Sequence, residues 1–380
     1  MTGRGHEVTI VGPDDPNAQP SELPPRYISL PSIPLRNHPG FYLAMPSKSS
    51  LEALRDANFD MLNTVHMPSV YNVLLPDALN HVSSVNHLFE EKVMPWVESN
   101  TTDAYNAGDA LVCLSPGLKR YWREHGVEVP IHVIPRAIET RIFDETGQDD
   151  PFAAEAKPGA RLLVVCRHAR EKEVDRLLRI FAQHVYPRVE GATLTLVGDG
   201  PESEALKELT KELGIDHRTH FVGEQGLQQM PAWFRHADLF VYTSLSETYG
   251  QVISEALWCG LPVVAMVDPT AEDADSQFGG HIELLLTKAT LRCQMSEQAT
   301  RNAKRRSDPE ACVKRYLEVF EVAKDHAARN PGGSQLVAYR SLARWAAMHS
   351  TVAAMGLMRK PVELNRNHAA TGTWTISAAS

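Results

Sequence analysis

Short apolar runs alternate with amphipathic stretches through the second half of the chain. The stretches at 172–186 and 202–213 carry apolar residues at helical spacing. The apolar runs have the length and composition of buried strands and lie at 162–165, 193–197, 219–222, 239–242 and 262–266. Because strands that alternate with helices commonly pair in parallel, this pattern predicts a doubly wound α/β domain.

The first half is less regular but carries similar signals. Strand-like runs occur at 6–12, 57–66, 82–86, 110–115 and 131–134. The Pro-rich segment 20–46 contains recurrent apolar residues, so we expect an extended surface loop there rather than disorder. A polar stretch at 144–159 predicts a linker between domains.

These boundaries predict two domains and a tail. The first domain covers residues 1–145 and the second covers residues 146–325. Residues 326–380 then form a C-terminal helix and tail. Within them, 335–358 has an amphipathic pattern with interspersed basic residues, whereas 369–380 is typical of disorder.

The composition indicates a globular protein in a reducing compartment. The 380 residues suffice for two domains, and 43% hydrophobic with 22% charged residues is typical of soluble proteins. A net charge of -9 disfavours a nucleic-acid partner. No apolar run reaches the ~18 residues of a spanning helix, and the N-terminus lacks a secretory signal pattern. The five cysteines are scattered, which disfavours a disulfide framework or a zinc site and predicts a cytoplasmic location.

Two acidic residues mark the expected ligand site of the second domain. Glu247 and Glu255 lie on either side of a predicted loop-to-helix junction, and the first helical N–H groups lie near Tyr249, Gly250 and Gln251. Unpaired N–H groups and the positive end of the helix dipole favour an anion such as a diphosphate. Carboxylates accept hydrogen bonds from sugar or ribose hydroxyls. A nucleoside diphosphate sugar combines these groups, and doubly wound domains bind ligands beyond the carboxyl ends of their strands.

The spacing of Glu247 and Glu255 resembles the E-x(7)-E signature of family 4, whose members are retaining glycosyltransferases of the GT-B fold. Further segments resemble the family's motifs in their order along the chain: 164–167 with Glu171 and Lys172, 194–201, 221–223 and 237–241. The resemblance implies two Rossmann-like doubly wound domains that face each other across a cleft. It also implies transfer of a hexose from a nucleoside diphosphate sugar, UDP- or GDP-linked, to an acceptor hydroxyl.

The resemblance assigns roles near the reacting bond. Arg167 and Lys172 would neutralise the departing diphosphate, although two charges at a helix start are also typical of a solvated surface. Glu247 would contact the donor sugar or, in the simpler interpretation, cap the helix. His87 lies in a segment that resembles the family's T-x-H-T and would bind the donor sugar near the reacting carbon. A structural histidine is the alternative for His87 and for His66, which resembles another strand end of the family and closes the run at 57–66.

Donor-binding residues are implied around the same helix and at two strand ends. Glu255 would accept hydrogen bonds from the ribose hydroxyls, with a surface charge as the alternative. Backbone N–H groups of Tyr249, Gly250 and Gln251 would bind the diphosphate. Strand-end residues complete the set: Gly198 in a turn that is equally typical of structure alone, and Gly223 and Glu224 beside the nucleobase.

The sequence departs from the family pattern at three places. Cys166 stands where the family usually has glycine. Residues 135–138 (PRAI) stand where many relatives have P-N-G-I, which changes the turn and lets Arg136 reach toward a phosphate. Residues 4–8 (RGHEV) resemble the end of the family's first βα unit. We therefore expect that unit to be missing, through a misassigned start or a real truncation.

The implied chemistry needs no metal or other cofactor, because Arg167, Lys172 and the helix N-terminus would hold the charge that Mg²⁺ otherwise balances. The D-x-D spacing at 273–275 predicts solvated surface. Segment 30–47 resembles family members that glycosylate membrane lipids. A lipid is therefore the first acceptor to expect, with the protein at the inner face of a membrane. The sequence specifies neither the donor sugar and base nor the oligomeric state.

Two other functions remain open. A non-catalytic GT-B relative that binds a nucleotide sugar, or serves as an assembly partner, is favoured by the missing opening unit and by the departures at Cys166 and Arg136. A GT-B nucleotide-sugar epimerase or phosphorylase would share the donor site. A Rossmann dehydrogenase is disfavoured, because no strand-linked G-x-G-x-x-G occurs.

Overall fold

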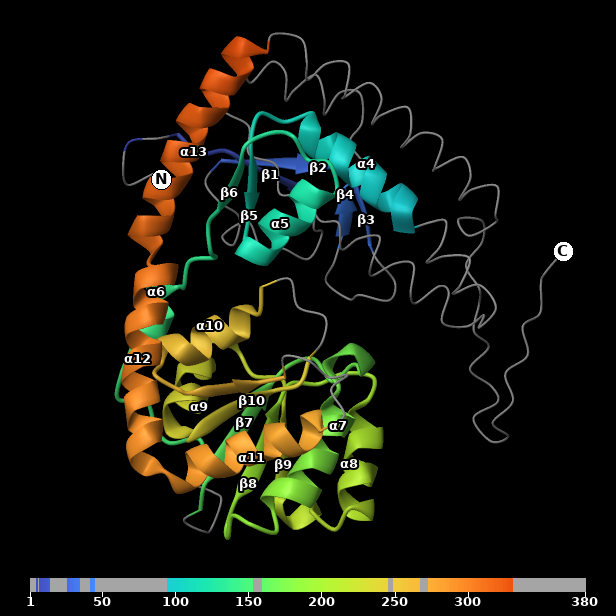
Figure 1. Ribbon diagram of the computed structural model, residues 1–380, viewed down its shortest axis with the longest axis vertical. Coiled ribbons are helices and arrows are strands. Elements are labelled where there is room, and N and C mark those ends of the chain that lie inside the picture. Colours follow the sequence, from blue (N-terminus) through green and yellow to red (C-terminus); the bar gives the residue numbers. More distant parts are fainter. Residues whose placement is uncertain are drawn as a thin grey trace, which may run out of the picture. The chain divides into compact units, whose positions relative to one another are not determined.

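The computed structural model describes residues 5, 7–13, 26–34, 42–44, 94–152, 159–244, 249–266 and 273–330 (Figure 1). The chain divides into two compact units. The described residues of the first unit lie within 1–67, 112–118 and 132–321, and those of the second lie within 68–111, 119–131 and 322–380.

The first unit is built on a five-stranded sheet. Its strand order is β11-β10-β7-β8-β9, and every neighbouring pair is parallel. The strands are β7 (Arg161–Val165), β8 (Thr193–Val197), β9 (Thr219–Gly223), β10 (Leu239–Tyr242) and β11 (Val263–Ala265). Each end lies within one residue of the predicted run. The doubly wound α/β prediction is therefore confirmed for this part of the chain.

Helices connect these strands and follow them. They are α6 (Thr140–Phe143), α7 (Val174–Ile180), α8 (Ser203–Glu212), α9 (Met230–His236), α10 (Gln251–Trp258), α11 (Ala274–Thr287), α12 (Ala289–Ser307) and α13 (Pro309–Arg329). A π-helical turn at Phe181–Val185 extends α7, and 3₁₀ turns lie at Arg170–Lys172, Asp216–Arg218 and Leu227–Gln229. The two helices expected within 172–186 and 202–213 are confirmed as α7 and α8.

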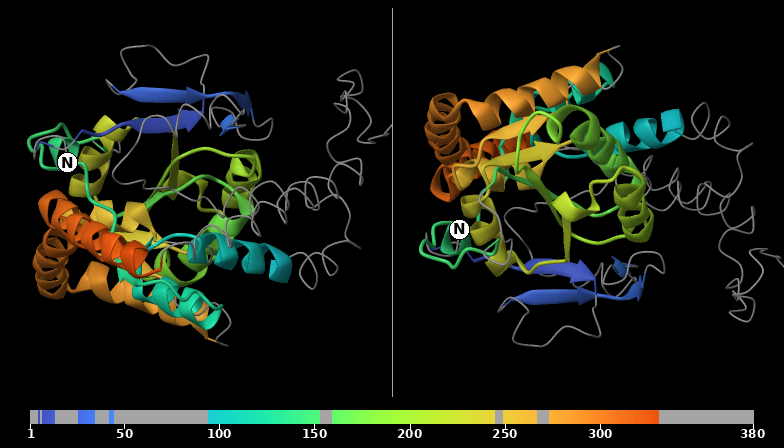
Figure 2. Two further views of the ribbon diagram at one scale, coloured as in Figure 1. Left: turned by 90° about the horizontal axis from the view of Figure 1, so that it is seen from above. Right: turned by 90° about the horizontal axis from the view of Figure 1, so that it is seen from below.

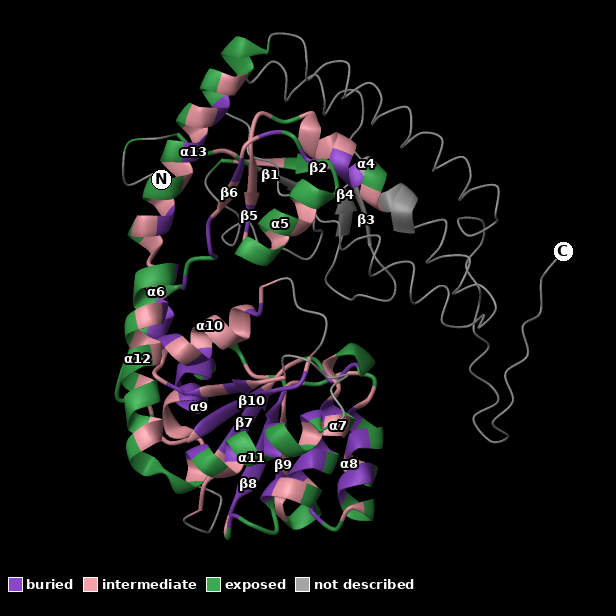
Figure 3. Ribbon diagram, in the orientation of Figure 1, coloured by how far each residue is buried: buried purple, intermediate pink, exposed green. Residues whose placement is uncertain are grey.

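Side-chain alternation along the strands divides the core into two apolar layers. Leu162 and Leu239 belong to a cluster with buried residues of α7, α8 and α11. Leu163 and Phe240, one position further along the same strands, belong to a second cluster with residues of α6, α9, α10 and α12. Successive side chains of a strand point to opposite faces, so helices cover the sheet on both sides. Figure 3 accordingly shows β7, β8 and β10 in the colour of buried residues.

Short strands occur near the start of the chain. β1 (Ile10–Pro13) pairs in parallel with β2 (Tyr27–Leu30), and the two are the adjacent blue arrows of Figure 2. β3 (Ser32–Pro34) pairs antiparallel with β4 (Tyr42–Ala44). The expectation of a loop across 20–46 was therefore wrong for these residues. Tyr, Ile and Leu favour strands, and runs of three or four residues between prolines show no periodicity.

The polar stretch expected to form a linker is anchored to the second apolar cluster. Phe152 is 0% exposed and stacks edge-on against Trp233, with ring centroids 4.8 Å apart. Asp144 accepts a hydrogen bond from Trp258 Nε1 at 2.9 Å. Phe143, at the end of α6, is 1% exposed. Residues 143–152 are thus held against α9 and α10, while the proposed domain boundaries stay a prediction.

The remaining elements include a pair of strands that the sequence predicts. β5 (Leu111–Cys113) and β6 (Ile131–Val133) form a two-stranded sheet, in agreement with the runs at 110–115 and 131–134. In the second unit, α4 (Met94–Asn106) carries Glu98, which binds Tyr121 OH of α5 (Pro116–Glu124). Burial, helped by this carboxylate, raises the pKa of Tyr121 to about 12. The predicted runs at 57–66 and 82–86 and the helix within 335–358 lie outside the described residues.

Candidate functional site

The N-terminus of α10 follows the carboxyl end of β10, and none of the described residues caps it with a side chain. Gly250, which precedes the first helical residue, adopts φ +69°. A Cβ at this position would come within 3.1 Å of Ile253 Cδ1, so both conformation and space favour glycine. Among the described residues no side chain binds the first N–H groups of α10, and the binding role expected for Gly250 and Gln251 stays a prediction.

A hollow of about 750 Å³ opens beside this helix end. Arg136, Gln251 and Glu255 are among the residues that line it. Burial raises the pKa of Glu255, while a hydrogen bond from Gln251 and the positive charge of Arg136 act in the opposite direction. The glutamate that the sequence assigns to ribose hydroxyls thus lies in a cavity, with an amide and a cation as its neighbours.

Gln251 carries an unsatisfied acceptor in the same hollow. Its Oε1 atom is buried and accepts no hydrogen bond from the residues that the structure describes. Buried polar atoms nearly always have partners, so this oxygen can accept a donor that the described residues do not supply. A ribose hydroxyl or a nucleobase N–H has the required chemistry.

Gly198 fixes the ends of β7 and β8 against each other. It adopts φ +130°, and a Cβ on it would lie 2.0 Å from the Cys166 carbonyl oxygen. Its N–H donates to the Gly223 carbonyl at 2.8 Å. Gly198 therefore serves the close packing of strand ends, which is the structural alternative considered for it. Cys166 is accommodated, because its side chain is half-buried and packs against both apolar clusters.

A buried polar network that the sequence did not indicate holds the segment around Arg167. His168 is 1% exposed, and its Nδ1 lies 2.9 Å from Ser203 Oγ, which in turn donates to Asp199 Oδ1 at 2.5 Å. His168 N donates to the Asp199 carbonyl at 2.9 Å. Burial lowers the pKa of His168. His168 lies 35 positions before Ser203, so no local pattern in the sequence indicates that it meets Ser203 and Asp199.

Arg167 and Lys172 lie at the end of β7, where the sequence places them. Arg167 is exposed and makes no side-chain hydrogen bond or ion pair within the described part of the chain. Lys172 is half-buried, and its carbonyl accepts a hydrogen bond from Thr243 Oγ1 at 3.1 Å. Neither residue lines the hollow at Glu255.

The other predicted residues divide into two groups. Tyr249 OH lies 3.4 Å from Ser307 Oγ, and Gly223 adopts φ +74° with open space around its Cα. Glu224 is exposed beside it. Glu247 and His87, together with His66, lie outside the described residues, so their predicted roles stay predictions.

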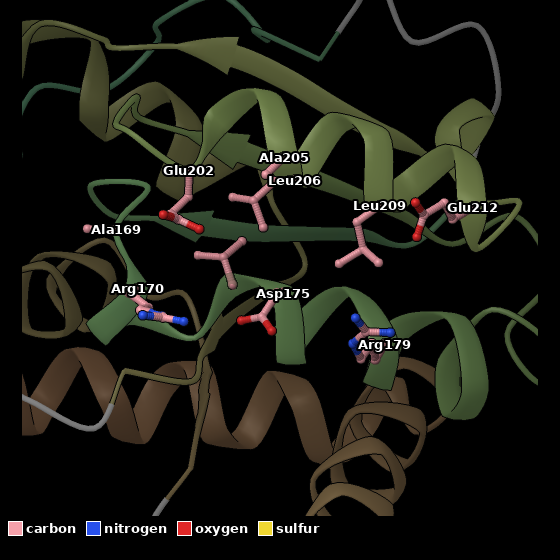
Figure 4. A pocket seen from close by; sticks show the side chains of 10 residues that line it. Ala169, Arg170, Asp175, Arg179, Glu202, Ala205, Leu206, Leu209 and Glu212 are labelled. Atoms are coloured by element: carbon pink, nitrogen blue, oxygen red, sulfur yellow. The ribbon is translucent and has the colours of Figure 1, made fainter. Parts of the chain in front are cut away.

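A second hollow, of about 320 Å³, lies between α7 and α8. Leu206 and Leu209 point into it from α8, and Arg170 and Glu202 lie opposite each other at one end (Figure 4). Arg179 extends beside it from α7. This hollow contains no residue of the predicted site.

Comparison with known sequences decides the family. The sequence model described as Glycosyl transferases group 1 matches residues 148–301, and the one described as Glycosyltransferase Family 4 matches residues 1–142. The chain belongs to the family 4 glycosyltransferases. The resemblance inferred from Glu255 and the four other motifs is confirmed.

Several members of this family with curated names are similar to the chain. An alpha-monoglucosyldiacylglycerol synthase from Streptococcus pneumoniae is 30% identical over 180 residues, which are 45% of this chain and 41% of the relative. A synthase of the same name from Acholeplasma laidlawii is 24% identical over 296 residues, 70% of this chain and 73% of the relative. The lipopolysaccharide core biosynthesis glycosyltransferase LpsD of Rhizobium meliloti is 28% identical over 233 residues, 57% of this chain and 65% of the relative.

Solved structures of GT-B enzymes share the fold. Sucrose-phosphate synthase from Thermosynechococcus elongatus has a TM-score of 0.53 at 21% identity and covers 72% of this chain and 70% of its own. A mutant of TarM from S. aureus has a TM-score of 0.50 at 14% identity and covers 59% of this chain and 46% of its own. The GT-B fold class is thereby confirmed.

Two further properties concern the described residues alone. Among them, no helix combines the length and apolar character needed to cross a membrane. The same residues hold no group of three or more His, Cys, Asp or Glu side chains arranged to bind a metal ion. Chemistry without a metal stays a prediction.

Proposed function

We propose that this protein transfers a hexose from a nucleoside diphosphate sugar to an acceptor hydroxyl, with retention of configuration. The observation that carries the proposal is the hollow at α10, where Glu255, Gln251 and Arg136 lie beside the N-terminus of the helix. A carboxylate and an amide oxygen suit ribose hydroxyls, and a cation beside helical N–H groups suits phosphates. Family membership and the names of the relatives support the same class of reaction.

Stabilisation of the leaving group is the main task of this chain's side chains in the proposed reaction. Negative charge grows on the phosphate oxygens as the glycosidic bond breaks. Arg167, Lys172 and the N–H groups of α10 would hold that charge without a metal. Glu247 would position the donor sugar, and His87 would hydrogen-bond it near the reacting carbon. The acceptor hydroxyl oxygen would then bond to the sugar carbon on the face from which the diphosphate departs and would pass its proton to the departing phosphate oxygen, so the configuration is retained.

We further propose a membrane lipid with a free hydroxyl as the acceptor, at the cytoplasmic face of a membrane. Two similar proteins are named alpha-monoglucosyldiacylglycerol synthase, and another is the gpi3 subunit of a phosphatidylinositol N-acetylglucosaminyltransferase from Schizosaccharomyces pombe. The resemblance of segment 30–47 to lipid-glycosylating members supports the same choice.

Donor binding is tested by thermal shift with a panel of UDP-, GDP- and ADP-hexoses. We expect one nucleotide class to raise the Tm of the wild-type protein, since a ligand present at about 100 times its Kd stabilises by about 2.7 kcal/mol. Glu255→Ala and Arg167→Ala should reduce that rise. Glu212→Ala is the matched control, because Glu212 is an exposed carboxylate at the hollow between α7 and α8. No shift with any of these nucleotide sugars would overturn the proposal.

Turnover is tested separately, with the donor that binds and with vesicles that contain diacylglycerol or phosphatidylinositol. We expect a glycolipid product whose anomeric configuration, read by NMR, matches that of the donor. Transfer to soluble sugars alone would contradict the lipid acceptor. Binding without turnover would favour a non-catalytic relative, and a product formed without acceptor would favour an epimerase or phosphorylase.

A further inference from the structure

The loop between β6 and α6 is fixed on both sides of Arg136. Ile134 is 1% exposed and Ile138 is 2% exposed, whereas Arg136 between them is exposed and lines the hollow. Ile138 N donates to the Ser307 carbonyl at 3.1 Å. Because both flanks are buried, the fold itself directs Arg136 toward the hollow.

The same anchor also holds the start of α10. Ser307 approaches Tyr249 OH through its own Oγ at 3.4 Å, while its carbonyl accepts the N–H of Ile138. The loop and the N-terminus of α10 are therefore both attached to the end of α12. The cation of the loop and the N–H groups of the helix are presented to one cavity.

We propose that Arg136 binds the phosphate attached to the ribose of the donor, an assignment that rests on the proposed donor-binding function of this hollow. The charge of Arg136 acts on the Glu255 carboxylate, so the guanidinium lies within electrostatic reach of the ribose-binding position. The phosphate bonded to the ribose is the anion of the donor nearest to its hydroxyls. A guanidinium binds two phosphate oxygens at once, and the asparagine of related P-N-G-I loops has no charge to offer.

This assignment divides the diphosphate between two cations. Arg136 holds the ribose-side phosphate, while Arg167 remains for the sugar-side phosphate, where charge develops during the reaction. Arg136 is therefore a donor-binding residue, and its loss should weaken ground-state binding. A role that acts only through Glu255 makes a different prediction, because it would weaken binding of the nucleoside itself.

The test compares uridine, UMP and UDP binding by ligand-observed NMR, which detects affinities in the millimolar range; guanosine ligands replace them where the wild type prefers guanine. Arg136→Ala should weaken UMP and UDP binding by about tenfold, because one charge-assisted contact is lost, and should leave uridine binding unchanged. Arg136→Lys should recover part of the loss. Arg179→Ala is the control for charge, since Arg179 is an exposed cation at the other hollow.

The outcomes separate this inference from the function on which it rests. Wild-type protein that binds neither nucleotide series would overturn the proposed function. Equal UMP affinity in wild type and Arg136→Ala would overturn the assignment of Arg136 alone. A loss confined to UDP would place Arg136 at the other phosphate, and an equal loss for uridine would show that it acts through Glu255; either result contradicts the proposal. Because Arg136 is exposed, the variants should keep the wild-type Tm.

Discussion

Glu255 lies where burial opposes its ionised form, and this has a measurable consequence for stability. Burial raises the pKa of Glu255 above its usual 4.5, and Gln251 and Arg136 offset only part of that effect. Between the unfolded and folded pKa values the folded protein binds more protons, so the stability that this group contributes falls as the pH rises. Glu255→Gln should remove this fall. Urea unfolding from pH 4.5 to about 7 measures it.

The control for Glu255→Gln is a variant that loses a carboxylate elsewhere in the protein. Glu212→Gln deletes an exposed carboxylate of α8 and should leave the slope of stability against pH as it is in the wild type. A slope that is the same in Glu255→Gln and in wild type would contradict the buried, proton-binding carboxylate described for the hollow.

Glu173 holds a conformation that other residues avoid. Its φ is +49°, in the left-handed region, between the 3₁₀ turn at Arg170–Lys172 and α7. We expect Glu173→Gly to stabilise the protein by about 1 kcal/mol, because glycine adopts this conformation without a steric penalty. The lost ion pair with Arg176 matters little, since Arg176 keeps Asp275 at 2.6 Å. Chemical denaturation measures the difference.

A neighbouring substitution tests whether the gain comes from the backbone conformation. Glu171 lies in the 3₁₀ turn and does not have a positive φ. Glu171→Gly should therefore lower stability, because glycine only adds freedom to the unfolded chain. Stabilisation by both substitutions would indicate an effect of charge instead of conformation.

At the scale of elements, the sequence predicts the strands that coincide with runs of four or five strand-forming residues. All five residues of β8 are buried, and a run of leucine, valine and threonine without any charged residue is typical of a strand that is covered on both faces. The start of α10 near Gly250 was predicted from the loop-to-helix junction and the resemblance to the E-x(7)-E signature, while the ligand roles of Gly250 and Glu255 stay predictions. The short strands β2, β3 and β4 could not be predicted, since runs of three or four residues carry no periodicity. Phe152 was also missed, because a lone aromatic in a polar stretch gives no pattern.

The contact between the ends of β7 and β8 can be tested by adding one methyl group. In Gly198→Ala the new Cβ would lie 2.0 Å from the Cys166 carbonyl oxygen, at a backbone conformation of φ +130°. We expect a loss of about 3 kcal/mol from the free energy of unfolding, measured in urea, because strain and overpacking add.

The control is alanine at another glycine with a positive φ, where the new Cβ would not clash with a neighbouring atom. Gly214 adopts φ +68°, and a Cβ there would meet no atom within 4 Å. Gly214→Ala should therefore cost about 1 kcal/mol. Equal losses at the two positions would mean that the strand ends are not in the close contact described.

At the scale of the whole molecule, residues before the second domain complete its core. Ile138 and Phe143, which precede residue 146, are buried in the cluster that includes Phe152 and residues of α9, α10 and α12. We expect a fragment of residues 134–330 to unfold in one cooperative transition in a calorimeter. A fragment of residues 146–330 lacks α6 and should unfold at a lower temperature or aggregate, because deleting a buried aromatic costs about 3–5 kcal/mol. Identical transitions would show that α6 contributes nothing to the core.

The docking of α6 also limits where this chain can exchange halves with a relative during evolution or in the laboratory. A crossover inside the polar stretch would unite α6 of one parent with α9 and α10 of another, and their side chains would no longer be matched in size. In a crossover upstream of Ile134, α6, α9 and α10 all come from one parent. Arg136 and α10, which lie at the same hollow, then also come from that parent. Recombinants joined upstream of Ile134 should therefore be more stable than those joined within the polar stretch at 144–159.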